Sequence, residues 1–316
     1  YYLAGISAKH SGAFGIAAWV ILAVFALFVA MFFSELIAMF PTGGGIYSMA
    51  KETYGRFKSF MLAWLLWIVG NFSMALAIVA AVEYLLPYSV TIYVVIGIIF
   101  GIFWIITLNY MAYRGLGIST MIIATFGVLT LATCIFTILP VLLNMPQLFS
   151  GAGLGTFFNP SHFVPLFKHS GAFTNILYLA MTVFLISELW FGFESISFLS
   201  NETEHPEKTL PHSLIITTGI VTFLLLAYFV ASLGVLPLKI FASSSVPFGI
   251  IGKITMGKFG EQFLVLGTYL IILGGAALWP VTGARLLKHM AEDKLFIKFA
   301  ADIHPKNKTP YKAIMF

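Results

Sequence analysis

The sequence alternates long apolar stretches with short polar ones. A helix needs about 20 apolar residues to cross about 30 Å of hydrocarbon, so each long stretch predicts a membrane-spanning helix. The stretches lie at residues 14–40, 57–86, 90–110, 117–142, 173–201, 211–236 and 262–287. A partial helix is expected before Gly12, and another begins near Phe316. The pattern predicts an all-α polytopic membrane protein with seven complete spans.

Three segments between the spans have a different character. Residues 46–54 place apolar side chains at helical spacing beside Lys51 and Glu52, which is typical of a short interfacial helix. Residues 144–171 are rich in Pro, Gly, Ser and Asn, which predicts an irregular loop. Residues 237–260 contain three consecutive serines and scattered lysines. We expect a long loop with short interfacial helices there.

The stretch at 173–201 departs from a uniform apolar span. Glu188 and Glu194 lie on either side of Gly192. A carboxylate at bilayer depth costs about 2.5–3.5 kcal/mol on insertion scales, so it usually faces a cavity or a partner. A glycine allows the helix to open and expose its backbone to a ligand. We therefore predict a broken membrane helix at a binding site, with four neighbouring substrate contacts: Trp190, Phe191, Gly192 and Phe193.

The composition supports a membrane protein and narrows the chemistry. Of the 316 residues, 60% are hydrophobic and only 9% are charged, which excludes a soluble domain. The net charge of +5 is explained by basic cytoplasmic loops, so nucleic acid is not an expected partner. The single cysteine, Cys134, excludes disulfides and cysteine metal sites within the chain. We expect no metal and no cofactor.

The basic residues predict the orientation of the chain in the membrane. If the loop after the first complete span is cytoplasmic, twelve of the 17 Lys and Arg residues fall on that side. Basic loops remain in the cytoplasm, so the N-terminus and the loop at 200–211 are expected there. The sequence starts at Tyr1 and stops as a new apolar segment begins, which we interpret as a fragment.

Three motifs lie at residues 34–44, 191–211 and 285–310. Together they resemble the amino acid/polyamine/organocation permeases, and most closely the arginine/agmatine-type antiporters. Residues 191–195 (Phe-Gly-Phe-Glu-Ser) with the turn at 201–211 are similar to the family's sixth-helix pattern. Residues 34–36 and 40–44 resemble the end of its second helix and the following loop. Residues 285–295 and 304–310 resemble the end of the eighth helix and its cytoplasmic connection. The three motifs occur in the family's order and span nearly the whole chain.

The resemblance implies an inverted-repeat transporter fold of five plus five helices. Its first and sixth helices are discontinuous at mid-membrane, where helix ends offer N–H groups to a carboxylate and carbonyls to an ammonium. It implies a truncated fold here, with the start of the first helix and the last helices missing. Residues 1–142 would form the first repeat, 143–172 an extracellular loop, and 173–316 part of the second repeat.

The resemblance also implies further substrate contacts. Asn71 and Met74 match a third-helix stretch that lines the substrate, and Trp279 matches a tryptophan that packs on it. Pro280 departs from the family pattern and predicts a kink beside Trp279. The alternative is structural, with Asn71 bonding between helices and Trp279 filling a packing position.

Several residues have alternative roles in coupling or structure. Glu188 replaces an aromatic gate, so it pairs with a cationic substrate, takes up a proton, or forms an ion pair inside the bundle. Glu194 matches a family carboxylate that handles a proton or tethers the broken helix. For Glu35 we favour a structural ion pair at a membrane edge. Thr282 offers one hydroxyl to a sodium site.

These patterns predict a secondary active transporter, a permease or antiporter, for amino acids or related amines. It would sit in the cell membrane and work by alternating access. The alternatives are a proton- or sodium-coupled symporter, a channel, and a non-transporting intramembrane enzyme. An enzyme is disfavoured because the histidines and Asp293 and Asp302 fall in loops or at span ends. The expected partners are a small-molecule substrate and the lipid bilayer, and a homodimer stays open.

Overall fold

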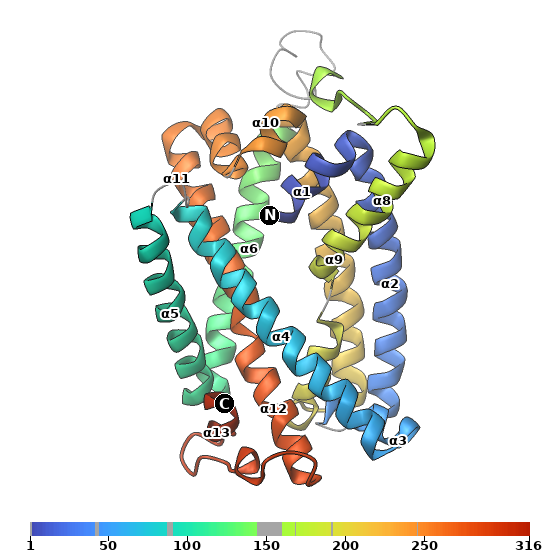
Figure 1. Cartoon of the computed structure of the whole chain (residues 1–316), viewed down its shortest axis with the longest axis vertical. Coiled ribbons are helices and arrows are strands. Elements are labelled where there is room, and N and C mark those ends of the chain that lie inside the picture. The colour runs from blue at the N-terminus through green and yellow to red at the C-terminus, as the bar shows by residue number, and fades with distance from the viewer. Residues whose placement is uncertain are drawn as a thin grey trace. The chain divides into compact units, whose positions relative to one another are not determined.

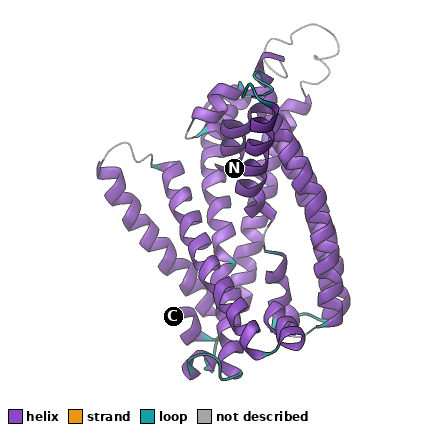
Figure 2. Cartoon of the chain, turned by 45° about the vertical axis from the view of Figure 1, so that its right-hand side comes forward, coloured by secondary structure: helices purple, strands orange, loops and turns teal. Residues whose placement is uncertain are grey.

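The computed structural model describes residues 2–41, 44–86, 91–143, 160–167, 169–190, 192–244 and 246–316. Within these ranges the elements are helical, and no strand occurs (Figures 1 and 2). The α-helices are α1 (Tyr2–Ser11), α2 (Gly15–Met39), α3 (Gly45–Tyr54), α4 (Arg56–Leu85), α5 (Thr91–Arg114), α6 (Leu116–Leu143), α8 (Ala172–Ile186), α9 (Pro206–Val235), α10 (Leu238–Ser243), α11 (Pro247–Ala277), α12 (Trp279–Glu292) and α13 (Tyr311–Met315). The 3₁₀ segments are η1 (Gly12–Phe14), η2 (Pro160–Phe163), η3 (Ser187–Trp190), η4 (Phe193–Glu202) and η5 (Lys298–Ala301).

Seven segments of the described chain are long and apolar enough to cross a membrane. This agrees with the predicted all-α polytopic protein. The short helix expected at 46–54 is α3. Most of the loop expected at 144–171 lies outside the described residues.

Two predicted boundaries are wrong. The span expected from 211 begins five residues earlier, because Pro206 suits the first helical position, where its missing N–H would lack a partner anyway. The last span was expected at 262–287, but α11 already begins at Pro247 and contains one non-helical residue, Gly257 (φ 67°, ψ −153°). It ends at Ala277, and α12 begins at Trp279 with Pro280 in its first turn, where a kink was predicted.

The predicted interruption at Gly192 is present. Regular α-helix ends at Ile186, and 3₁₀ segments occupy both sides of Gly192. Gly192 itself is left-handed, with φ 107° and ψ 3°, a conformation that glycine adopts without steric cost. Long 3₁₀ stretches are uncommon and often mark a functional hinge or strain.

The chain forms two compact units. The first unit comprises residues 1–28, 129–191 and 217–269, and the second comprises 29–128, 192–216 and 270–316. Helices α2, α6, α9 and α11 contribute residues to both.

Aromatic packing forms the core of the first unit. Trp19 stacks on Phe229 with 4.5 Å between ring centroids, and it meets Trp190 edge-on at 5.7 Å. Both indoles have polar partners: Trp19 Nε1 donates to Ser7 Oγ at 3.1 Å, and Trp190 Nε1 donates to Thr222 Oγ1 at 3.2 Å. These contacts anchor the end of η3 in the first unit.

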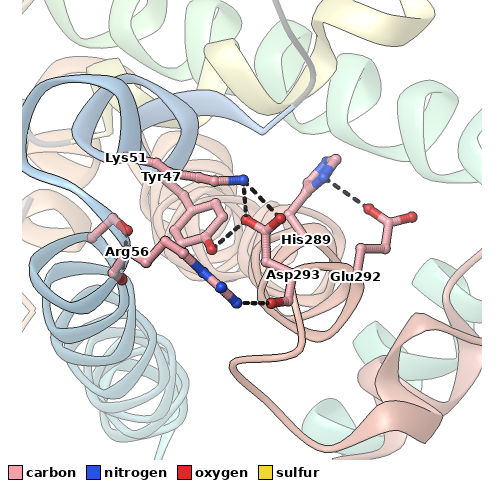
Figure 3. A network of polar contacts seen from close by, with 7 residues as sticks. Tyr47, Lys51, Arg56, His289, Glu292 and Asp293 are labelled. Carbon is pink, nitrogen blue, oxygen red and sulfur yellow. Dashed lines mark hydrogen bonds and ion pairs between the residues drawn. The ribbon is translucent and has the colours of Figure 1, made fainter.

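Helix α4 is central to the second unit, where it packs against α3, α5 and α12. Buried side chains from α3, η4 and α12 form an apolar core that includes Tyr47, Phe198, Leu286, Leu287 and Met290. At its edge, Asp293 follows the last residue of α12 and is held by three side chains (Figure 3).

The Asp293 network joins α3 and the start of α4 to the end of α12. Lys51 Nζ lies 2.7 Å from each carboxylate oxygen, and Tyr47 Oη donates to Oδ2 at 2.6 Å. Arg56 donates to the Asp293 backbone carbonyl at 2.7 Å, so a cation caps the negative end of α12. Burial acts to raise the pKa of Asp293, but hydrogen bonds from Lys51 and Tyr47 and the nearby cations outweigh it and lower that pKa. Burial and the hydrogen bond to Asp293 raise the pKa of Tyr47.

We predict that Asp293→Asn lowers the free energy of unfolding at pH 7 by about 1–2 kcal/mol, because hydrogen bonds to a charged group are lost. The loss is limited because Lys51 is partly exposed and solvent screens its charge. The pKa of Asp293 is lower in the folded protein than in the unfolded chain, where it is about 3.9. The stabilisation is therefore present at pH values above the unfolded-state pKa and is lost as the pH falls through the folded-state pKa. The parent should therefore lose more stability than Asp293→Asn on acidification below about pH 5. Thermal unfolding in detergent measures both effects.

The matched control is Asp302→Asn, because Asp302 pairs with Lys312 at 2.6 Å at an exposed site. Such a pair contributes little. Equal losses in the two variants at pH 7 would contradict the role assigned to Asp293.

Candidate functional site

A cavity of about 630 Å³ in the second unit lies among α4, α5, α12 and α13. Its described lining carries no formally charged side chain and is rich in aromatic rings. The lining residues are Trp67, Asn71, Met74, Ala75, Ile105, Ile106, Asn109, Tyr110, Tyr113, Trp279, Pro280, Gly283, Ala284, Ala313, Ile314, Met315 and Phe316.

Helical spacing brings the α4 residues to one face. Trp67, Asn71 and Met74 follow one another at intervals of four and three residues, so their side chains share one side of the helix. On α5, Asn109 and Tyr113 are likewise four residues apart. The cavity therefore lies between one face of α4 and one face of α5, and each face carries one asparagine.

Two glycines make room for Trp279. A Cβ atom on Gly70 would lie 2.2 Å from the indole ring carbons, and one on Gly283 would lie 2.9 Å from the ring. The indole therefore packs directly on the backbone of α4 and on the next turn of its own helix. This contact fixes Trp279 beside Asn71, the residue that follows Gly70.

Two asparagines, Asn71 and Asn109, line the cavity. Asn71 Nδ2 donates to the Trp67 carbonyl at 2.8 Å, and Asn109 Nδ2 donates to the Ile105 carbonyl at 2.8 Å. Each amide thus uses one N–H within its helix, and its second N–H and its carbonyl oxygen are the groups that could bind a ligand. Aromatic faces attract cations, so acceptors beside indole and phenol rings suit an ammonium or guanidinium group.

Three predicted substrate contacts, Asn71, Met74 and Trp279, thus line one cavity. Glu188 and Trp190 belong to the first unit, and the structure does not bring them to this cavity. Glu188 is exposed at η3, whereas Trp190 is buried in the aromatic core. Phe191 lies outside the described residues.

Gly192, Phe193 and Glu194 belong to the second unit but do not line the cavity. Phe193 stacks on Phe33 with 6.3 Å between centroids and packs against an apolar cluster that contains Ile37. Glu194 lies in the first turn of η4, directly after the break, and its backbone carbonyl accepts a hydrogen bond from the Ser197 hydroxyl. Both roles expected for Glu194, as a tether of the broken helix and as a proton carrier, stay predictions.

The remaining candidates lie apart from the cavity. Glu35 is exposed near the end of α2. Thr282 is buried, and its hydroxyl donates to the Leu278 carbonyl at 3.3 Å. Within the described residues, no group of three or more His, Cys, Asp or Glu side chains could hold a metal.

Sequence reasoning missed Trp67, Asn109, Tyr110 and Tyr113 as cavity residues. A signal was present in α5, where Asn109 lies four residues before Tyr113 in an apolar helix. Tyr110 has a partner of its own, because Arg114 donates to its hydroxyl at 2.9 Å and lies 5.7 Å from its ring centroid.

Comparison with known proteins gives a consistent picture. The family described as "Amino acid permease" matches residues 1–316. The chain is 24% identical to the branched-chain amino acid permease BcaP of Bacillus subtilis (strain 168), over 100% of this chain and 68% of the relative. It is 29% identical to a probable polyamine transporter of Arabidopsis thaliana, over 66% of this chain and 39% of the relative. It is 26% identical to a polyamine transporter of Oryza sativa subsp. japonica, over 83% of this chain and 43% of the relative.

These relatives carry the names of transporters, not of enzymes. The chain spans about two thirds of the length of the bacterial permease and less than half of the plant transporters. A family match along all 316 residues, with seven segments able to cross a membrane, shows that this multi-pass chain belongs to the amino acid permease family.

Proposed function

We propose that the protein is a secondary active transporter for amino acids or related amines, and that the cavity between α4, α5 and α12 forms part of its substrate site. The observation that carries the proposal is the lining of this cavity. Two asparagines and several aromatic rings line it, and no described lining residue carries a charged side chain. Branched-chain amino acids and polyamines, the classes in the relatives' names, share an ammonium group that such a lining can bind.

The interrupted helix supports alternating access around the site. Helix ends at a break expose N–H and carbonyl groups that can bind the two charges of a zwitterion. The left-handed Gly192 between two 3₁₀ segments supplies such a break. We propose that it belongs to the second of two inverted repeats, at 173–316, with the first at 1–142.

The proposal includes exchange of substrates as the transport mode, with proton- or sodium-coupled symport as the alternative. Glu188 is the candidate to pair with a cationic substrate or to carry a proton, and Glu194 is the candidate tether. Thr282 offers only one hydroxyl to a sodium site; that hydroxyl donates its hydrogen to the Leu278 carbonyl, which leaves its oxygen lone pairs for a cation. We place the N-terminus and the loop at 200–211 in the cytoplasm, as the distribution of basic residues indicates.

Substitution of the cavity residues tests the substrate site. In full-length protein reconstituted in liposomes, we predict that Asn71→Leu and Trp279→Leu each raise the KM for counterflow of leucine or spermidine about tenfold or more, because each removes roughly 1.4 kcal/mol of contact energy. The control Trp104→Leu removes an indole from α5 that does not line the cavity. Unchanged KM values for both substrates in both cavity variants would refute this site.

The close approach of α4 to Trp279 gives a second test. Gly70→Ala places a methyl group in the indole ring, so Trp279 must move, and such overpacking typically costs about 1–3 kcal/mol. We expect weaker substrate binding in a thermal-shift titration of the full-length protein. Gly127→Ala is the matched control, because its Cβ would meet nothing within 4 Å. If Gly70→Ala binds substrate as Gly127→Ala does, the packing of Trp279 does not shape the site.

A further inference from the structure

Another cavity of the second unit, of about 470 Å³, lies between α4 and α5. Its nine described lining residues are all aliphatic or glycine, so the lining offers no polar side chain. Two of them, Ala75 and Ile105, also line the proposed substrate cavity, so the two cavities meet there. We infer that this apolar groove holds the side chain of the substrate, and that the protein selects neutral amino acids with aliphatic side chains over polyamines and basic amino acids. The inference rests on the substrate site proposed above.

The apolar groove continues the helix faces that line the substrate cavity. On α4, Ala75 follows Asn71 by four residues, so the two side chains share one side of the helix. On α5, Ile105 precedes Asn109 by four residues, and Gly101 precedes Ile105 by another four. Each face therefore changes from polar to aliphatic along its helix. A substrate whose charged group lies at the asparagines has an aliphatic surface directly beside it.

The groove is long enough for an extended aliphatic side chain. On α5 its lining runs from Ile105 back to Val94, which is roughly 16 Å at the helical rise of 1.5 Å per residue. Its inner wall is closed, because Ile78 is only 1% exposed and Gly97 is buried. Its outer edge is open, because Ile98 is 58% exposed. A substrate side chain in the groove would therefore be shielded from water on one side and partly shielded on the other.

The lining of the groove distinguishes the two proposed classes of substrate. A polyamine or a basic amino acid held at Asn71 and Asn109 by one ammonium group would place its second cationic group in the groove, where no described side chain can accept a hydrogen bond. Burial of a charge without a partner is strongly unfavourable. An aliphatic side chain gains affinity instead, by about fourfold for each methylene that is fully buried. The groove therefore favours neutral aliphatic amino acids.

The test measures dissociation constants by titration calorimetry of the full-length protein in neutral detergent. The ligands are straight-chain amino acids of increasing length: alanine, norvaline, norleucine and 2-aminoheptanoate. The affinity of the parent protein should rise about two- to fourfold for each added methylene, because the open edge makes burial incomplete. Lysine differs from 2-aminoheptanoate by an ammonium group in place of the terminal methyl group. Lysine and spermidine should each bind about tenfold more weakly than 2-aminoheptanoate, or weaker still.

Gly101→Leu tests the groove itself. A Cβ atom at Gly101 would lie 3.9 Å from Ile78 Cγ2, an ordinary contact, so a side chain can be added there. We expect about tenfold weaker binding of 2-aminoheptanoate, because the added side chain takes the place of about two buried methylenes. The change for alanine should be much smaller, because Gly101 lies a helical turn beyond Ile105. Gly127→Leu is the matched control, because its Cβ would meet nothing within 4 Å and Gly127 lines neither cavity. If Gly101→Leu does not fold, Gly101→Ala replaces it, with a smaller loss expected.

The outcomes separate this inference from the proposed site. If alanine binds and Asn71→Leu weakens it, but affinity does not rise along the series, the site stands and the inference is overturned. The groove would then be left to an acyl chain of the bilayer. The inference is also overturned if lysine or spermidine binds as tightly as 2-aminoheptanoate, or if Gly101→Leu and Gly127→Leu bind the series alike. If neither the amino acids nor spermidine bind, the proposed site fails and the inference fails with it.

Discussion

The structure depends on a backbone constraint at Gly192. Lipid offers no hydrogen-bond partners, so a helix that stops within a membrane span must satisfy its free backbone groups by other means. Part of that need is met locally, because Ser195 N donates to the Gly192 carbonyl at 3.0 Å. The boundary between the two compact units falls between Phe191 and Gly192, so the break also separates two independently packed parts of the chain.

The residues beside the break explain how it is held. Trp190 is buried against Trp19 in the first unit, and Phe193 packs on Phe33 in the second. Each side of Gly192 is therefore anchored by an aromatic ring in its own core. The proposed substrate contacts of the second unit lie on other helices, where Gly70 lets Trp279 lie next to Asn71. Glycine thus serves two purposes here: a backbone conformation at 192 and a close helix contact at 70.

The sequence predicted the features that depend on local composition. Apolar length determined the seven spans, and a glycine between two acids indicated the break. Asn71, Met74 and Trp279 could be chosen from a family resemblance, and the structure places them around one cavity. Contacts between distant residues could not be predicted: the Lys51–Asp293 pair joins positions 242 residues apart. Nor could periodicity show that Trp190 and Phe193 fill apolar cores, because packing and ligand-facing aromatics have the same spacing.

Backbone hydrogen exchange at residues 192–194 of the full-length protein tests the central claim most directly. An interrupted helix leaves amides without helical partners, so they should exchange faster than the amides at the centre of α8 in the absence of substrate. They should then slow when an amino acid or polyamine substrate binds. Amides as protected as those of α8, and unchanged by any transported substrate, would contradict a binding site built on this break.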